Sequence, residues 1–148
     1  MSARSKRFQR LAELRKRELD EAAGKLQLAA EELKRLTREV ELLESRLAQA
    51  MQQRAQLVDS GAEAQDFVIA DNWQRAQQQK LGLAKHEQQQ AQLACSRAQA
   101  HVIQARAKVK AMETLKERAD QEHSRMLEVA ERKLEDDFAA RVARKESP

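Results

Sequence analysis

Apolar residues recur every three or four positions along the first part of the chain. If Leu19 is taken as position a of a heptad, position a holds Leu19, Leu26, Leu33, Val40 and Leu47, and position d holds Ala22, Ala29, Leu36, Leu43, Ala50 and Leu57. Apolar residues sustained at a and d over several heptads are typical of a coiled-coil seam. The pattern predicts a first helix over about residues 4–58.

The heptad pattern stops at Val58–Ala62, where Asp59, Ser60 and Gly61 supply strong turn signals. We therefore expect a turn over about residues 59–64. Gly24 falls at an outward f position, where glycine weakens a helix by roughly 1 kcal/mol without ending it.

A second heptad pattern follows the turn and predicts a helix over about residues 65–145. Position a holds Phe67, Gln74, Leu81, Gln88, Cys95, Val102 and Val109, and position d holds Ala70, Gln77, Ala84, Ala91, Ala98, Ala105, Met112 and Ala119. This seam is small and partly polar, so it suits the leucines of the first helix better than a second copy of itself. The sequence thus predicts an all-α fold in which two long helices form an antiparallel coiled-coil hairpin, with residues 1–148 as one elongated domain. One long parallel dimer or a dimer of hairpins stays open.

The hairpin register has two consequences. Leu43 is expected near Gly82 and Leu19 near Arg106, and the second helix has no partner beyond about residue 121. This overhang carries an apolar stripe, formed by Leu127, Leu134, Phe138 and Val142. An amphipathic helix without an intrachain partner is a candidate docking face for another protein. The alternatives are that the stripe closes a homodimer, or that it packs on Phe8, Leu11 and Leu14.

Composition and charge support this interpretation. Charged residues make up 35% of the chain and aromatic residues only 3%, as in long helices and coiled coils. The net charge of +4 is unevenly distributed, because residues 1–17 hold seven basic side chains against Glu13 alone. This basic end is either an electrostatic docking point for an acidic partner or a solvated helix start.

The sequence lacks the motifs of several kinds of functional site. The three glycines stand far apart, so no phosphate-binding loop is expected. His86, His101 and His123 are scattered, and we predict no metal, no cofactor and no enzymatic activity. Because the residues that read bases are missing from the basic end, we expect no nucleic-acid partner. No apolar run is long enough to span a membrane, so we expect no direct membrane insertion. The single Cys95 fits a reducing cytoplasm.

The chain resembles the FliJ family of the bacterial flagellar type III export apparatus over nearly its full length. The resemblance rests on Leu11-Ala12-Glu13-Leu14 leading to Glu18-Leu19-Asp20-Glu21-Ala22-Ala23, on a turn containing Gly61, and on the stretches Ala111–Arg118 and Arg132–Arg141. It implies an antiparallel two-helix stalk that couples a hexameric export ATPase to a membrane export-gate protein and handles export chaperones. It also implies a cytoplasmic protein, peripheral to the inner membrane.

The resemblance implies two contact regions. The ATPase-docking end would comprise Arg7, Phe8, Arg10, Leu11, Leu14, Leu127, Leu134, Phe138 and Arg141. The export-gate patch would comprise Leu43 and Trp73, although this chain lacks the tyrosine that is usual there. An alternative reading of Trp73 is a residue at the rim of the seam. The stalk of a virulence-type injectisome and an unrelated homodimeric scaffold remain as alternative functions.

Overall fold

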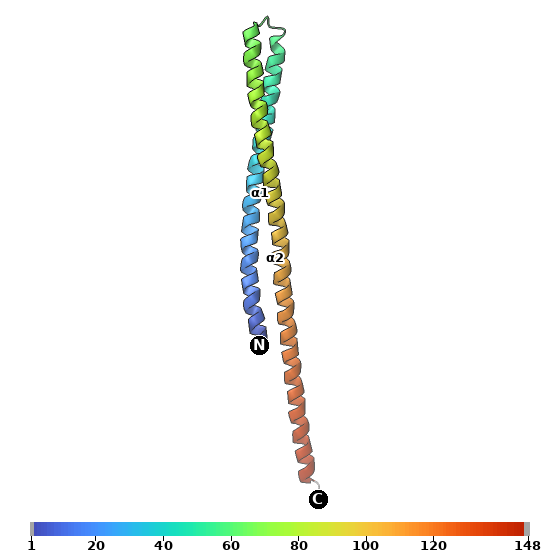
Figure 1. The fold of residues 1–148 in the computed structure, drawn as a ribbon. Helices are drawn as coiled ribbons and strands as arrows, with labels where there is room; N and C mark the ends of the chain where they lie inside the picture. The colour runs from blue at the N-terminus through green and yellow to red at the C-terminus, as the bar shows by residue number, and fades with distance from the viewer. Residues whose placement is uncertain (1, 147–148) are drawn as a thin grey trace. The chain divides into compact units, whose positions relative to one another are not determined.

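The computed structural model describes residues 2–146 as two α-helices joined by a short connection. Helix α1 spans Ala3–Leu57 and helix α2 spans Ala64–Glu146 (Figure 1). The described residues contain no strand. The all-α antiparallel fold predicted from the heptads is confirmed, and Gly24 lies within α1 without ending it.

Local hydrogen bonds define where the helices begin. At the start of α1, the Ser5 amide donates to Ser2 Oγ at 3.0 Å, so Ser2 caps this end. At the start of α2, the Glu63 amide donates to Asp66 Oδ2 at 3.1 Å, which is the reciprocal half of a capping box. Between the helices, Gly61 adopts a φ of 70°, a conformation that glycine takes without steric cost. The turn therefore falls where the sequence predicts it.

The described chain groups into two compact units, each containing part of both helices. The first unit consists of residues 22–102 and includes the turn. Its core consists of Val40 and Leu43 from α1 and Leu81 and Ala84 from α2, with Leu47 packed against it. The expected proximity of Leu43 to Gly82 is thereby confirmed, since Leu81 and Ala84 flank that glycine.

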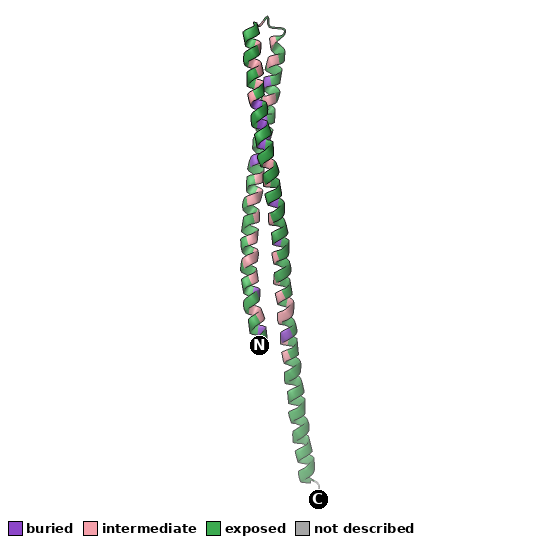
Figure 2. Cartoon of the chain, viewed as in Figure 1, coloured by how far each residue is buried: buried purple, intermediate pink, exposed green. Residues whose placement is uncertain are grey.

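Polar contacts fix the register inside this unit. The Arg54 guanidinium donates to Asp71 Oδ1 at 2.8 Å, and Gln88 Nε2 donates to Thr37 Oγ1 at 3.2 Å. The predicted a and d positions of both helices are buried or half-buried throughout residues 22–102 (Figure 2). Large side chains of α1 thus face small side chains of α2, as the composition of the two seams requires.

The second unit consists of residues 2–21 and 103–146. Ion pairs join Arg4 to Glu122 and Lys16 to Glu113, each at 3.6 Å, which is the register expected from the sequence. The seam continues to the start of α1 through Ser5 and Ala12, both buried. Heptad positions before Leu19 escaped the sequence prediction because serine and alanine give little hydrophobic signal.

Candidate docking surfaces

The end of α2 carries the first candidate surface. All residues from 124 to 146 are exposed, which confirms the predicted overhang (Figure 2). We call Leu127, Leu134, Phe138 and Val142 the overhang stripe, in which Phe138 is 70% exposed. The expected alternative, in which this stripe packs on Phe8, Leu11 and Leu14 of the same chain, is wrong. The overhang stripe is therefore available to another molecule.

The flanks of the overhang stripe are charged but balanced. Residues 124–146 contain six basic and six acidic side chains, so this segment offers no net charge to a partner. A shallow hollow runs beside Phe138 and Val142 and is bordered by Arg141, Arg144 and Lys145. Apolar contact with basic flanks at the last turns of the helix is the chemistry that this segment can provide.

The start of α1 carries the remaining residues expected at the ATPase-docking end. Arg7, Arg10, Leu11 and Leu14 are exposed, whereas Phe8 is half-buried at a d position. The Arg4 guanidinium carbon lies 5.7 Å from the centre of the Phe8 ring, within cation–π range. Leu11 and Leu14 face outward because the seam passes through Ala12 between them.

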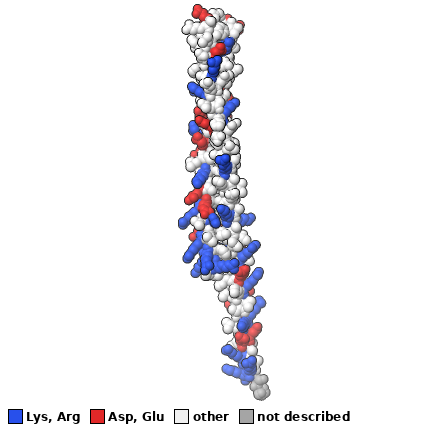
Figure 3. All heavy atoms as spheres, in the orientation of Figure 1, with Lys and Arg blue, Asp and Glu red and all other residues white. Residues whose placement is uncertain are grey.

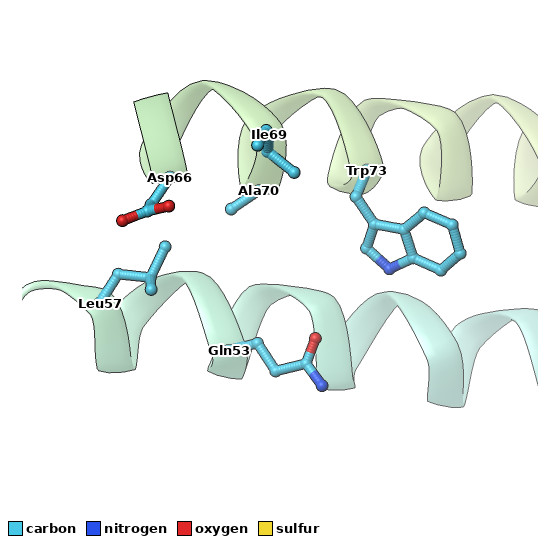
Figure 4. A pocket seen from close by; sticks show the side chains of 6 residues that line it. All are labelled: Gln53, Leu57, Asp66, Ile69, Ala70 and Trp73. Carbon is cyan, nitrogen blue, oxygen red and sulfur yellow. The ribbon is translucent and has the colours of Figure 1, made fainter. Parts of the chain in front are cut away.

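The second candidate surface lies near the turn, around Trp73. The indole is 53% exposed and borders a shallow apolar pocket with Gln53, Leu57 and Ile69 (Figure 4). Leu43, by contrast, is only 6% exposed in the core between the helices. The structure therefore places Trp73 at the surface and Leu43 in the core beside Leu81 and Ala84, and the two do not form one exposed patch.

Arg54 organises the seam beside this pocket. Its guanidinium carbon lies 5.1 Å from the centre of the Phe67 ring, and the guanidinium forms an ion pair with Asp71. The charge at this a position is therefore balanced by a carboxylate and an aromatic ring. Asp66, which caps α2, also lines the pocket. The pocket around Trp73 thus lies beside the capped start of α2 and the ion pair between Arg54 and Asp71.

One charged pair of α1 has shifted pKa values. A hydrogen bond from Arg35 lowers the pKa of Glu32, and the same bond raises the pKa of Arg35, but this pair lies on an open helix surface. Residues 2–146 hold no cluster of three or more His, Cys, Asp or Glu placed to bind a metal ion. Across the same residues, no helix is long and apolar enough to cross a membrane.

Comparison with known families decides the affiliation. The family model described as flagellar FliJ protein matches residues 4–147. The chain belongs to the FliJ family. Membership makes it a flagellar export protein of a structural stalk family. No curated protein and no solved structure matches the chain significantly.

In this FliJ-family chain the structure also brings cations of α2 to the basic end, and the sequence alone did not assign them to it. The register of the second unit places α2 residues 108–122 alongside α1 residues 4–17. The α2 segment adds the cations Lys108, Lys110, Lys116 and Arg118. Lys and Arg gather around the start of α1 on the visible face in Figure 3. These cations join the basic end only through the hairpin register, because the two segments lie far apart in the sequence.

Proposed function

We propose that this FliJ-family chain is the stalk that couples the hexameric export ATPase to the membrane export-gate protein, and that it handles export chaperones. The observation that carries the proposal is the overhang stripe, an amphipathic helix end with no intrachain partner. A ring-shaped ATPase can enclose such a helix on all sides, which suits a segment exposed over its whole circumference. In this proposal the chain transmits contacts and catalyses nothing.

The ATPase contact is assigned to the chain-terminal residues. The overhang stripe supplies the apolar part, and Arg141 with the basic start of α1 supplies charge. Phe138 and Leu134 are the most exposed large members of the stripe, so they offer the most area to bury on docking. Burial of such a side chain contributes about 1.5–3 kcal/mol.

The test is a binding and activity assay with the export ATPase of the same cell. Leu134→Asp with Phe138→Asp should abolish both ATPase binding and any change in ATPase assembly or turnover. The control, Val129→Asp with Ala140→Asp, adds the same two charges on the opposite side of the same helix. Circular dichroism should report equal helicity for both variants. Persistent binding by the stripe variant would exclude the overhang as the ATPase contact.

The export-gate contact is assigned to the surface around Trp73. An exposed indole beside a shallow apolar pocket is the kind of anchor that protein interfaces use. Leu43 is buried in the core and would not touch the gate protein. Trp73→Ala should weaken binding to the gate protein at least tenfold, whereas Leu83→Ala, which truncates another exposed side chain of α2, should not. Equal effects of the two substitutions would argue against a gate contact at Trp73.

A further inference from the structure

The paired part of the second unit has two unlike sides. Arg4 and Glu122, both g positions, meet on one side, and Lys16 and Glu113, both e positions, meet on the other. Residues 4–17 and the α2 residues 108–122 that face them hold eleven basic and five acidic side chains. Four of the five acids, Glu13, Glu113, Glu117 and Asp120, occupy b or e positions and so lie on the side of Lys16. The side of Arg4 carries one acid, Glu122, which pairs with Arg4.

The side of Arg4 also carries exposed leucines. Leu11 is 42% exposed and Leu14 is 49% exposed, and the register places Leu115 of α2, which is half-buried, opposite Leu11. Cations surround these leucines. We call this surface the leucine–arginine face, formed by Arg7, Leu11, Leu14, Lys108, Leu115 and Arg118.

The cations of the leucine–arginine face are not neutralised within the chain. Arg7, Lys108 and Arg118 are exposed, and none of them forms an ion pair with any residue in the range 2–146. The register even sets Arg7 across from Arg118. Such an arrangement of like charges favours an anionic partner by simple Coulomb attraction.

We propose that the leucine–arginine face binds the surface of a bilayer that contains anionic lipids. Lipid phosphates meet the cations while the leucines enter the boundary between headgroups and acyl chains. Nucleic-acid phosphates would satisfy only the cations and would leave the leucines in water. A fluid lipid surface also adapts to cations contributed by two helices, whereas a protein partner would need carboxylates at fixed matching positions.

This binding is separate from the proposed ATPase contact, although Arg7, Leu11 and Leu14 belong to both surfaces. The test therefore uses the full chain with vesicles alone, without ATPase. Vesicles of phosphatidylcholine with phosphatidylglycerol should co-sediment the protein, and vesicles of phosphatidylcholine alone should not. Because the attraction is screened within about 10 Å at 0.1 M salt, added salt should weaken it.

Two charge variants isolate the face. Arg7→Gln, Lys108→Gln and Arg118→Gln together should weaken vesicle binding roughly a hundredfold, at about fivefold for each cation. The control, Lys6→Gln, Arg106→Gln and Lys110→Gln, removes the same charge from the opposite side and should change binding much less. All six side chains are exposed, so both variants should keep the wild-type helicity.

Two further variants separate the apolar part of the contact from the overhang. Leu11→Ser with Leu14→Ser should weaken vesicle binding by about tenfold or more, because the leucine side chains move from water into the membrane interface on binding. Leu134→Asp with Phe138→Asp should leave vesicle binding intact. Equal losses in the two charge variants would overturn the proposal, as would loss through Leu134 and Phe138 alone. Binding to soluble polyglutamate or duplex DNA with none to anionic vesicles would also overturn it.

Discussion

Gln77 is a polar residue in an almost closed seam, and its replacement tests how the two helices hold together. It occupies a d position and is 1% exposed, and its Oε1 atom has no hydrogen-bond partner in the structure. A buried polar atom without a partner costs about 1–3 kcal/mol relative to solution. Gln77→Leu removes that atom with little change in volume. It should therefore raise the free energy of unfolding by about 1–3 kcal/mol.

Gln88 supplies a matched control in the same seam. Its Nε2 donates to Thr37 Oγ1 at 3.2 Å, while Thr37 Oγ1 donates to the Leu33 carbonyl at 2.8 Å. Gln88→Leu gains apolar surface but loses a hydrogen bond worth about 0.5–1.5 kcal/mol. The two effects oppose each other, so the free energy of unfolding should change little.

Urea titration followed by circular dichroism at the helical minimum measures both variants. We expect a higher urea midpoint for Gln77→Leu with an unchanged slope, because the surface exposed on unfolding is the same. Repeating the titration over a wide range of protein concentration shows whether the gain arises within one chain. A Gln77→Leu protein no more stable than the wild type, or a Gln88→Leu protein that gains as much, would refute the account.

Other consequences concern the core, the turn and the charged surface. Leu43→Ala should lower the free energy of unfolding by about 2–4 kcal/mol in urea titration, because its side chain fills the core of residues 22–102. Gly61→Ala should cost about 1–2 kcal/mol from its left-handed backbone alone, with no clash. Asp66→Ala should raise the hydrogen-exchange rate of the Glu63 amide that it caps. In NMR titration, Arg35→Gln should raise the pKa of Glu32.

The lowered pKa of Glu32 also determines how its ion pair with Arg35 affects stability at low pH. Because the pKa of Glu32 is lowered in the folded chain, the pair stabilises the fold above the ordinary pKa of glutamate. That contribution is lost as the pH falls through the lowered value. Both side chains are about half exposed, so water screens the interaction and its share of the total stability is small.

Heptad spacing was sufficient to predict the fold because it reports which side of each helix is buried. It located Leu36, Leu43 and Ala84 in the seam, and these side chains are buried in the structure. It failed to extend the seam to Ser5 and Ala12, whose small side chains resemble surface residues in the sequence. Periodicity detects large apolar side chains, whereas a tight seam also uses small ones.

The candidate sites were harder to predict, for a related reason. Leu11 and Leu14 look like core residues in sequence, but the seam passes through Ala12 and leaves them outside. The exposure of a side chain depends on its angular position around the helix. Shifting the heptad assignment by one residue changes that angle by about 100°. A count of charge along the chain does not assign Lys108 and Arg118 to the basic end, because they lie about a hundred residues away from it in the sequence. Applying the hairpin register to Arg7 would have pointed to Arg118.

The alanines of the seam impose an unusual constraint on sequence change. Ala12, Ala50, Ala84 and Ala119 are all at least 94% enclosed, where the backbones of the two helices come close. A larger side chain at such a position pushes the helices apart at a cost of about 1–3 kcal/mol. Exposed leucines such as Leu28 and Leu83 carry no such penalty. Over evolutionary time the smallest side chains of this protein should therefore be the slowest to change, while many of its leucines drift freely.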